Sequence, residues 1–429
     1  MLVKRKIDHG GFGYVEEVEL PTGDLAARKT FSPSVGNLTA NELEKLQRRF
    51  MREVKIQSEL KSKSFLPILG FDLDTSPPWF TMPLAEKNLT SFIRESKSAG
   101  TVPDAALSDI LNALEELHAL GYVHRDLKPD NVLLHEDIWK LSDFGLVLPP
   151  GNQTSRLTST YSAWGTMAYA APEQLTHFRS ATALADVYSF GCILHDIFSG
   201  KPRVPFDRHS GPGVIGSIIE KCTETKPERR FQTIAALRSV LIPSLNAQQI
   251  PKSSVEASPW VEAFEKNQNW ELEKIEALLR YLTQESEGDE ASTIMYAIDE
   301  QGIRKIYQVD KDLWKGLAIF YCEWVDGNSF PFSFCDVVVK RLEAVFDLGD
   351  IECKALAVTA AASMAMLHNR WFVMQRVLAM CSPLLEENAA RRVAIEIRAR
   401  ELRGDFIGCA EGISQGEFDY HPAIAGALK

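Results

Sequence analysis

Three short polar motifs follow one another in the first half of this 429-residue chain, and their order constrains its fold more than any other feature. They are HRDLKPDN at residues 124–131, DFG at residues 143–145 and APE at residues 171–173. Three independent motifs in this order are not explained by chance.

A glycine-rich segment lies upstream of these motifs, between two stretches that read as strands. Gly10, Gly11 and Gly13 lie in one hairpin, and Lys29 lies on the strand that follows. Glycines let backbone amides approach phosphate groups, and a lysine adds a point charge for the same groups. Taken alone, the segment fits an ordinary turn equally well, so its meaning depends on the motifs downstream.

Together the motifs resemble the eukaryotic-type Ser/Thr protein kinase family, and the resemblance covers residues 1–243. It implies an α+β bilobal fold in residues 1–245, with a small β-rich N-lobe over 1–82 and a helical C-lobe over 86–245. The implied activity is transfer of the γ-phosphate of ATP, bound with Mg²⁺, to hydroxyl groups of a protein substrate. Such transfer needs positioning and charge neutralisation more than covalent chemistry.

The resemblance also assigns roles to the residues of the motifs. Asp126 corresponds to the aspartate that orients the substrate hydroxyl and accepts its proton, and Lys128 to the lysine beside the γ-phosphate. Asn131 and Asp143 correspond to the two Mg²⁺ ligands. Thr166 corresponds to a threonine that bonds the catalytic aspartate, and with Lys128 it favours serine and threonine over tyrosine as acceptors.

Lys29 is expected to contact the α- and β-phosphates and to pair with a glutamate on a helix of about 20 residues that begins near Asn41. Glu53 is the best candidate, because it interrupts the apolar stripe of that helix, where a buried carboxylate needs a cationic partner. Glu42 and Glu59 are the alternatives.

The expected adenine contacts are apolar side chains that would otherwise be read as ordinary core. The backbone of residues 82–85 is expected to form the hinge that reads the adenine edge. The residues expected to enclose the adenine or to form the hinge are Val15, Ala27, Met82, Leu84 and Leu133.

The segment between Gly145 and Ala171 is crowded with hydroxyl groups. A phosphate on it would pair with Arg125 by charge-assisted hydrogen bonds and order the segment. Thr158 and Thr160 are the candidate sites of autophosphorylation, although neighbouring serines would serve as well.

Three further charged residues match scaffold positions of the family. Glu173 and Arg230 resemble a buried pair that ties the APE turn to a later helix. Asp186 resembles the aspartate that supports the backbone of the catalytic loop.

Three features depart from the family pattern. Asp8 stands where the first glycine of the phosphate loop is expected, and its charge would repel a triphosphate. Gln57 stands at a usually apolar packing position, which suggests a helix that leaves its active position easily. Residues 205–213 run almost directly into the next helix, so the elements that many members use for docking are trimmed.

The second half of the chain is built differently. Residues 246–258 are polar and predict a linker, and residues 259–429 read as seven or eight amphipathic helices. We expect an all-α domain of helical hairpins, repeat-like but without a fixed period of about 33 to 47 residues. Its expected role is regulation, partner binding or self-association. Arginines between Arg391 and Arg403 alternate with glutamates, which favours a salt-bridged solvent face over a site for an acidic partner.

Composition and charge narrow the binding partners and the cellular setting that we expect. A net charge of −11 offers no general attraction for nucleic acid or an anionic membrane, and no stretch of about 18 apolar residues predicts a membrane helix. Seven scattered cysteines without a C-x-x-C pair predict buried free thiols in a reducing, cytoplasmic setting.

Two other functions stay open at this stage. One is a weakly active or inactive pseudokinase scaffold that acts through its helical domain, which the retention of Lys29, Asp126, Asn131 and Asp143 disfavours. The other is a kinase of small molecules, which the presence of Lys128 and the APE motif disfavours.

Overall fold

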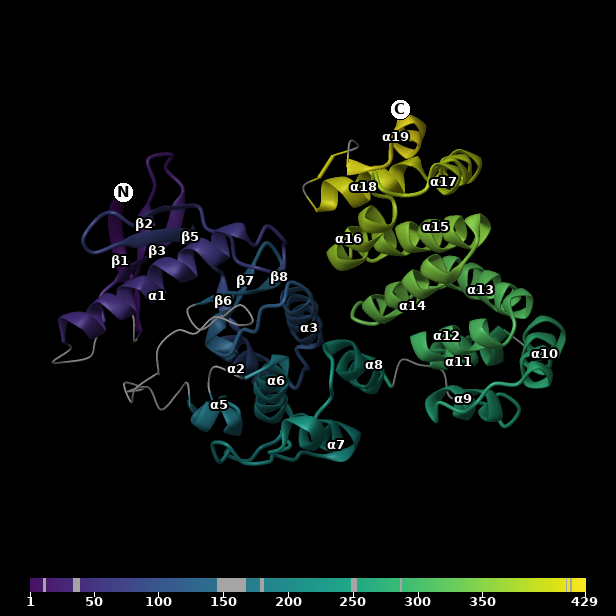
Figure 1. The fold of residues 1–429 in the computed structure, drawn as a ribbon, viewed down its shortest axis with the longest axis horizontal. Coiled ribbons are helices and arrows are strands. Elements are labelled where there is room, and N and C mark those ends of the chain that lie inside the picture. Colours follow the sequence, from purple (N-terminus) through teal and green to yellow (C-terminus); the bar gives the residue numbers. More distant parts are fainter. Residues whose placement is uncertain are drawn as a thin grey trace. The chain divides into compact units, whose positions relative to one another are not determined.

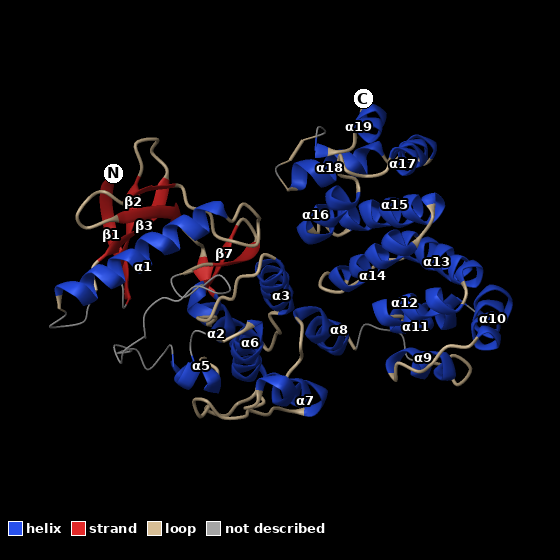
Figure 2. Ribbon diagram, viewed as in Figure 1, coloured by secondary structure: helices blue, strands red, loops and turns tan. Residues whose placement is uncertain are grey.

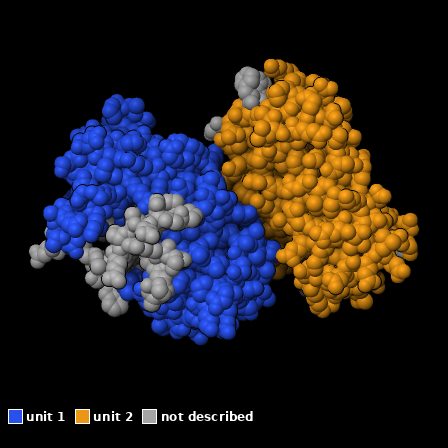
Figure 3. Space-filling view, in the orientation of Figure 1, with its two compact units in different colours: residues 1–241 blue, residues 242–429 orange. Residues whose placement is uncertain are grey.

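The computed structural model describes residues 1–10, 13–33, 39–144, 167–177, 181–247, 253–285, 288–413, 415–416 and 419–429. It divides into two compact units, coloured separately in Figure 3. Unit 1 comprises residues 1–241 and unit 2 comprises residues 242–429. All described strands lie in unit 1, so the two units have different architectures (Figure 2).

A five-stranded antiparallel sheet opens unit 1 (Figure 1). Its order is β1-β2-β3-β5-β4. A side chain at Gly13 would place its Cβ 2.0 Å from the carbonyl oxygen of Thr30, so β2 requires glycine where it passes β3. The strands are β1 (Leu2–Gly10), β2 (Gly13–Glu19), β3 (Leu25–Phe31), β4 (Gly70–Asp72) and β5 (Trp79–Pro83).

Helix α1 (Ala40–Glu59) packs on this sheet and begins one residue before the predicted start. Thr39 and Glu42 cap it reciprocally, which satisfies backbone donors at its first turn. Phe50 of α1 lies between two sheet residues, with ring centroids 5.6 Å from Phe31 and 5.5 Å from Phe80. These aromatic contacts hold the helix against β3 and β5.

The rest of unit 1 is a three-stranded antiparallel sheet and a set of helices. Helices α3 and α6 form its core, since most of their residues are buried. The sheet order is β6 (Lys87–Asn88), β7 (Val132–His135) and β8 (Ile138–Leu141). The helices are α2 (Leu89–Ala99), α3 (Asp104–Ala119), η1 (Pro129–Asn131), α5 (Pro172–His177), α6 (Ala183–Phe198), α7 (Gly213–Cys222) and η3 (Pro227–Arg229), followed by α8 (Ile234–Leu245), which crosses the boundary between the units.

Unit 2 is all-helical in the part that the structure describes. It contains more helices than the seven or eight expected, because several are only seven to ten residues long and leave a weak periodic signal. They are α9 (Ser258–Glu265), α10 (Leu272–Arg280), the π-helix η4 (Tyr281–Glu285), α11 (Gly288–Ala297), α12 (Glu300–Val309), α13 (Lys311–Asp326), α14 (Cys335–Leu348), α15 (Ile351–Leu367), α16 (Trp371–Met380), α17 (Glu387–Ala399), α18 (Arg403–Gly412) and α19 (Pro422–Leu428).

The helices of unit 2 stack in two layers (Figure 1). In one layer α13 packs on α15, α15 on α17 and α17 on α19. In the other layer α12 packs on α14, α14 on α16 and α16 on α18. This is a stack of helical pairs, and its helix lengths vary from 7 to 17 residues, which explains why the sequence shows no fixed period.

The interior of the chain matches the expectation from composition. All seven cysteines are buried with free thiols. Four of the five tryptophans of the helical half are buried as well: Trp270, Trp314, Trp324 and Trp371. Across the described ranges, no helix is both long and apolar enough to cross a membrane.

Candidate active site

A buried lysine on β3 has two carboxylate neighbours. The Nζ atom of Lys29, on β3, lies 2.8 Å from Oε1 of Glu53 on α1 and 3.4 Å from Oδ2 of Asp143. The structure thus joins Lys29 to Glu53 rather than to the two alternatives. Glu42 caps the start of α1, and Glu59 is exposed at its end.

The Lys29–Glu53 pair counts against the hypothesis that Gln57 lets α1 leave its position. The Gln57 side chain is buried, and its Nε2 atom donates a hydrogen bond of 2.7 Å to the carbonyl oxygen of Leu66. That bond fastens the helix to the segment that follows it. A polar side chain at this position therefore supplies a specific anchor in place of apolar packing.

The three charges of this cluster shift one another's pKa. Burial by itself lowers the pKa of Lys29, but the carboxylates of Asp143 and Glu53 outweigh it and raise that pKa. Burial by itself raises the pKa of Asp143, but Lys29 and other cations lower it to about 2. Lys29 and Asp143 are therefore both charged at neutral pH.

The catalytic-loop motif holds a second carboxylate. Lys128 Nζ lies 3.4 Å from Asp126 Oδ2, and Asn131 Nδ2 donates to the backbone carbonyl of Asp126 at 2.8 Å. Burial raises the pKa of Asp126, and the nearby charge of Asp143 raises it further, against the opposing effect of Lys128. The pKa values of Asp126 and Asp143 thus move in opposite directions, as expected of two acids with different tasks.

The backbone is strained at two of these positions. Arg125 has φ 64° and Asp143 has φ 63°, in the left-handed region that side chains disfavour by about 1–3 kcal/mol. Buried Asp186 stabilises the first position by accepting hydrogen bonds from the backbone N–H groups of His124 and Arg125, at 2.9 and 2.8 Å. Phe144 holds the second, because its buried ring packs against the ring of His124 at 5.3 Å.

The residues predicted to enclose an adenine lie on neighbouring strands. The register pairs Val15 with Lys29 and Ala27 with Met82, so these four side chains share one face of the sheet. Leu133 lies on β7 of the second sheet, and Leu84 follows β5 directly. Asp8, the departure from the glycine pattern, pairs with Val15 across β1 and β2 and accepts a hydrogen bond from the N–H of His9.

Some predicted positions lie outside the described residues: Gly11, Gly145, Thr158, Thr160 and Thr166. Gly10 and Gly13 are described and pair at the end of the β1–β2 ladder. Glu173 and Arg230 form a bidentate pair with distances of 2.7 and 2.8 Å, and the Arg230 side chain is fully buried. That pair ties α5 to the segment before α8.

The donor set of the site fits a hard divalent cation and the phosphates that accompany it. Asp143 offers an ionised carboxylate. The amide N–H₂ of Asn131 is engaged with Asp126, and within the described part no hydrogen bond reaches its Oδ1 atom, which is left as an acceptor. Carboxylate and amide oxygens are ligands that Mg²⁺ takes, together with substrate phosphates.

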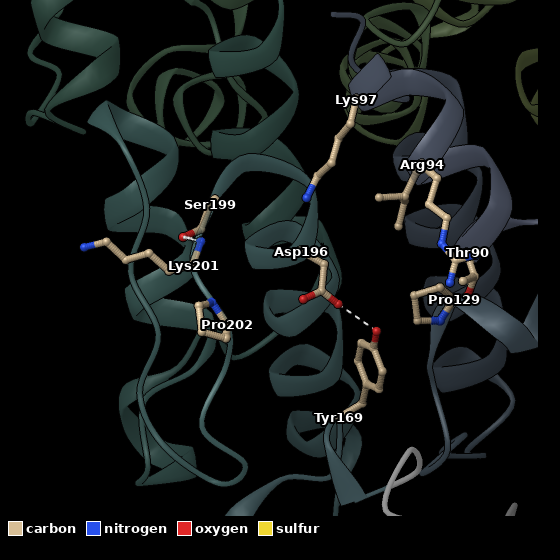
Figure 4. A pocket seen from close by; sticks show the side chains of 11 residues that line it. Thr90, Arg94, Lys97, Pro129, Tyr169, Asp196, Ser199, Lys201 and Pro202 are labelled. Atoms are coloured by element: carbon tan, nitrogen blue, oxygen red, sulfur yellow. Dashed lines mark hydrogen bonds between the residues drawn. The ribbon is translucent and has the colours of Figure 1, made fainter. Parts of the chain in front are cut away.

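Sequence reasoning missed a pocket beside the catalytic loop, lined among others by Arg94, Lys97 and Tyr169 (Figure 4). The spacing of Arg94 and Lys97 places both on one face of α2, which is a signal the sequence does contain. Tyr169 carried no such signal, because its neighbours come from distant segments.

Comparison with known proteins identifies similar chains. The family model described as "Protein kinase domain" matches residues 1–257. The serine/threonine-protein kinase AfsK of Streptomyces griseus is 29% identical over 278 residues, covering 60% of this chain and 33% of the relative. PknB of Mycobacterium leprae, also a serine/threonine-protein kinase, is 31% identical over 206 residues, covering 43% of this chain and 33% of the relative. The mitogen-activated protein kinase HOG1B of Wallemia ichthyophaga is 26% identical over 276 residues, with 63% and 69% covered. The match thus spans a third of the length of the two bacterial relatives.

Proposed function

Because this chain belongs to the protein kinase family, we propose that it is a Ser/Thr protein kinase that transfers the γ-phosphate of ATP to hydroxyl groups of proteins. One observation carries the proposal: Lys29 is joined to both Glu53 and Asp143, and Asp126 and Asn131 share one loop beside them. This arrangement supplies the lysine, the candidate base and the metal-binding side chains that phosphoryl transfer from Mg-ATP requires.

The nucleotide is held by residues of the first sheet. Lys29, kept in place by Glu53, neutralises the α- and β-phosphates. Val15, Ala27 and Met82 lie on the same face of the sheet and cover the adenine with apolar surface. Asp8 opposes this binding through its charge, which solvent and salt screen because the residue is exposed.

The metal is assigned to two residues. Asp143 and Asn131 would hold Mg²⁺ through their side-chain oxygens. When bound, Mg²⁺ neutralises the charge of the phosphates. The strained backbone at Asp143 is consistent with a side chain held for a ligand rather than for packing.

The acceptor hydroxyl is positioned by the catalytic loop. Asp126 orients the hydroxyl and accepts its proton, and burial, which raises its pKa, makes it a better base than an exposed aspartate. Lys128, 3.4 Å from Asp126, stabilises the charge that develops on the transferred group. The presence of Lys128 favours serine and threonine acceptors, and the threonine at position 166 supports the same choice.

Autophosphorylation belongs to the same proposal. The hydroxyl-rich segment contains Thr158 and Thr160, and Arg125 precedes the catalytic aspartate. A phosphate on either threonine would complement the charge of Arg125.

Labelled phosphate tests the function directly. Purified protein is incubated with Mg²⁺ and γ-labelled ATP, with and without a generic protein acceptor, and compared with Asp126→Ala and with Asp74→Ala, an exposed turn carboxylate, as the matched control. We expect labelled phosphoserine or phosphothreonine with the parent and Asp74→Ala, and a loss of about 100-fold or more with Asp126→Ala.

Three outcomes would overturn the proposal. Transfer that Asp126→Ala leaves intact removes the assigned base. ATP binding without transfer favours a pseudokinase scaffold, and label found in small metabolites but not in protein favours a small-molecule kinase.

We further propose that the helical pairs of unit 2 bind a protein partner or a second copy of the chain. Exposed apolar side chains support this role, since Leu384 is 95% exposed and Leu367 and Ile395 are exposed as well. Light scattering at rising protein concentration tests the self-association, and a constant monomer mass would overturn that part.

A further inference from the structure

A pocket of about 320 Å³ lies beside the catalytic loop in unit 1 (Figure 4). Its walls come from α2, from the loop that contains the catalytic aspartate, from the residues before α5, and from the end of α6 with the chain that follows it. The lining residues are Thr90, Ile93, Arg94, Lys97, Pro129, Tyr169, Asp196, Ser199, Gly200, Lys201 and Pro202.

Asp196 is the only carboxylate among these lining residues, and Arg203 already neutralises its charge. Arg203 donates to both oxygens of Asp196, at 2.6 and 3.0 Å. The hydroxyl of Tyr169 donates a third hydrogen bond to Asp196, at 2.7 Å, and the Arg203 guanidinium lies 4.0 Å from the centre of the Tyr169 ring. A carboxylate held in this way is not available to a basic ligand.

The cations of the pocket are not neutralised. Arg94, Lys97 and Lys201 are exposed, and within the described ranges no carboxylate pairs with any of them. In Figure 4 the side chain of Lys97 extends towards Asp196, and the side chain of Arg94 runs towards Thr90. The ammonium group of Lys201 extends away from Asp196. Arg94 and Lys97 therefore give the pocket its positive charge.

The pocket is close to the point of phosphate transfer. Pro129 lines it and follows Asp126 by three residues, so their Cα atoms are at most about 11 Å apart. Thr90 of α2 donates to Asp130 of the same loop at 2.7 Å, which ties this wall of the pocket to the loop. An extended peptide advances about 3.3 Å per residue, so a residue only a few positions from the acceptor reaches the pocket.

We propose that Arg94 and Lys97 bind an acidic side chain of the protein substrate, a few residues from the hydroxyl that is phosphorylated. The inference rests on the proposed function and adds a substrate class to it. Carboxylates and phosphates share the required chemistry, because a guanidinium binds either through two parallel hydrogen bonds. Among the lining residues a basic substrate residue finds no free carboxylate, since Arg203 already occupies Asp196.

A peptide scan tests the inference. Each peptide has one serine acceptor in a neutral background and one glutamate, moved from five positions before the serine to five positions after it. We expect one or two adjacent positions to raise kcat/KM by roughly fivefold to tenfold over the all-neutral peptide, and lysine there to lower it. Phosphoserine in place of glutamate distinguishes a carboxylate site from a site that prefers phosphate, and either preference supports the inference.

Substitutions of Arg94 and Lys97 test whether these two residues cause the preference for glutamate. The double variant Arg94→Ala and Lys97→Ala should abolish the preference for glutamate while leaving kcat/KM for the neutral peptide within about twofold, because alanine suits the exposed face of α2. Arg94→Glu with Lys97→Glu should reverse the preference towards lysine peptides. Lys226→Ala removes an exposed lysine that does not line the pocket and should change nothing.

Equal kcat/KM for all peptides, or a glutamate preference that survives the double alanine variant, would overturn the inference. Either result would leave the proposed function intact, because the neutral peptide would still be phosphorylated. If no peptide and no protein is phosphorylated by the parent, the proposed function itself fails.

Discussion

Each unit of this protein buries an ion pair, but the two pairs are balanced differently. In unit 1, Lys29 faces two carboxylates, Glu53 and Asp143, and about a third of the Asp143 side chain stays exposed. In unit 2, Arg370 binds the single carboxylate of Asp336 through hydrogen bonds of 2.8 and 2.7 Å, and both side chains are fully buried. The first cluster has two carboxylates for one lysine and is partly open to solvent, whereas the second is closed.

The surroundings of the two pairs reinforce the difference. The Arg370 guanidinium lies 4.6 Å from the ring centre of Phe332 and 5.6 Å from that of Trp371. These cation–π contacts and the two hydrogen bonds to Asp336 already stabilise the guanidinium, so a ligand would gain little by binding to it. The Lys29 cluster instead contains a strained aspartate backbone. An ion pair with unequal charges at a strained position indicates a binding site, and an equal, enclosed pair indicates a structural support.

The largest expected effect is a loss of phosphate transfer with little change in the free energy of unfolding. Asp143→Asn should lower phosphate transfer by about 1,000-fold or more, roughly 4 kcal/mol, because a metal ligand is lost. Its free energy of unfolding should change by less than about 1 kcal/mol, since Lys29 and Glu53 then balance one to one. Steady-state transfer and urea unfolding measure the two quantities, and a large loss of stability would make the cluster structural as well.

The converse effect is expected in unit 2. Arg370→Met removes both hydrogen bonds that the guanidinium donates to the buried Asp336 carboxylate and should lower the free energy of unfolding by about 3–5 kcal/mol, while transfer at low temperature stays within about twofold. Joint replacement of Arg370 and Asp336 by leucine should recover most of the loss. Fluorescence follows this unfolding, because most tryptophans of the chain lie in unit 2: Trp260, Trp270, Trp314, Trp324 and Trp371. A single variant as stable as the parent would contradict the comparison.

Acid sensitivity gives a smaller effect, and in unit 1 we expect a buried histidine to contribute to it. Burial, with the nearby charges of His195 and Arg203, lowers the pKa of His209 to about 4, and its Nε2 atom has no hydrogen-bond partner among the described residues. The unfolded chain binds the proton more readily, so stability is present above about pH 6.5 and is lost as the pH falls towards 4. We expect a loss on the order of 2 kcal/mol across that window.

The variant His209→Gln should flatten this acid response without changing the response of unit 2. Urea unfolding at pH 7 and pH 5 measures the difference. An equal decrease in the parent and the variant would show that other groups cause it.

The smallest expected effect concerns Gln57. Gln57→Leu removes the hydrogen bond to the carbonyl oxygen of Leu66 and also a buried Oε1 atom that finds no partner in the part of the chain that the structure describes. These changes oppose each other, so stability should shift by less than about 1 kcal/mol. Transfer should fall slightly if the hydrogen bond positions α1 and Glu53. A clear gain in transfer would instead restore the hypothesis that glutamine loosens the helix.

Much of unit 1 could be predicted, because its candidate catalytic residues lie in short sequence motifs. The pairing of Lys29 with Glu53 followed from one carboxylate in an apolar stripe, and the Glu173–Arg230 pair followed from family resemblance. The hydrogen bond that counts against the Gln57 hypothesis could not be predicted, because side-chain length alone does not show that Nε2 reaches a backbone carbonyl.

The pocket of unit 1 and the helix layers of unit 2 could not be predicted from the sequence. The physical reason differs from that for Gln57. Tyr169, Asp196 and Arg203 meet only after the chain has folded, and no local spacing links Tyr169 to Asp196. In unit 2 the helices are held by contacts between neighbouring pairs, so their lengths vary without loss of packing. Periodicity detects such helices one at a time, and it misses the short ones.

The central claim is that the Lys29 cluster is open to a metal–nucleotide complex. Calorimetric titration with ATP, in the presence and absence of Mg²⁺, tests it most directly on the parent and on Asp143→Asn. We predict that Mg²⁺ tightens ATP binding to the parent by about tenfold or more, and that Asp143→Asn abolishes this effect. An equal effect of Mg²⁺ on the parent and on Asp143→Asn would contradict the account.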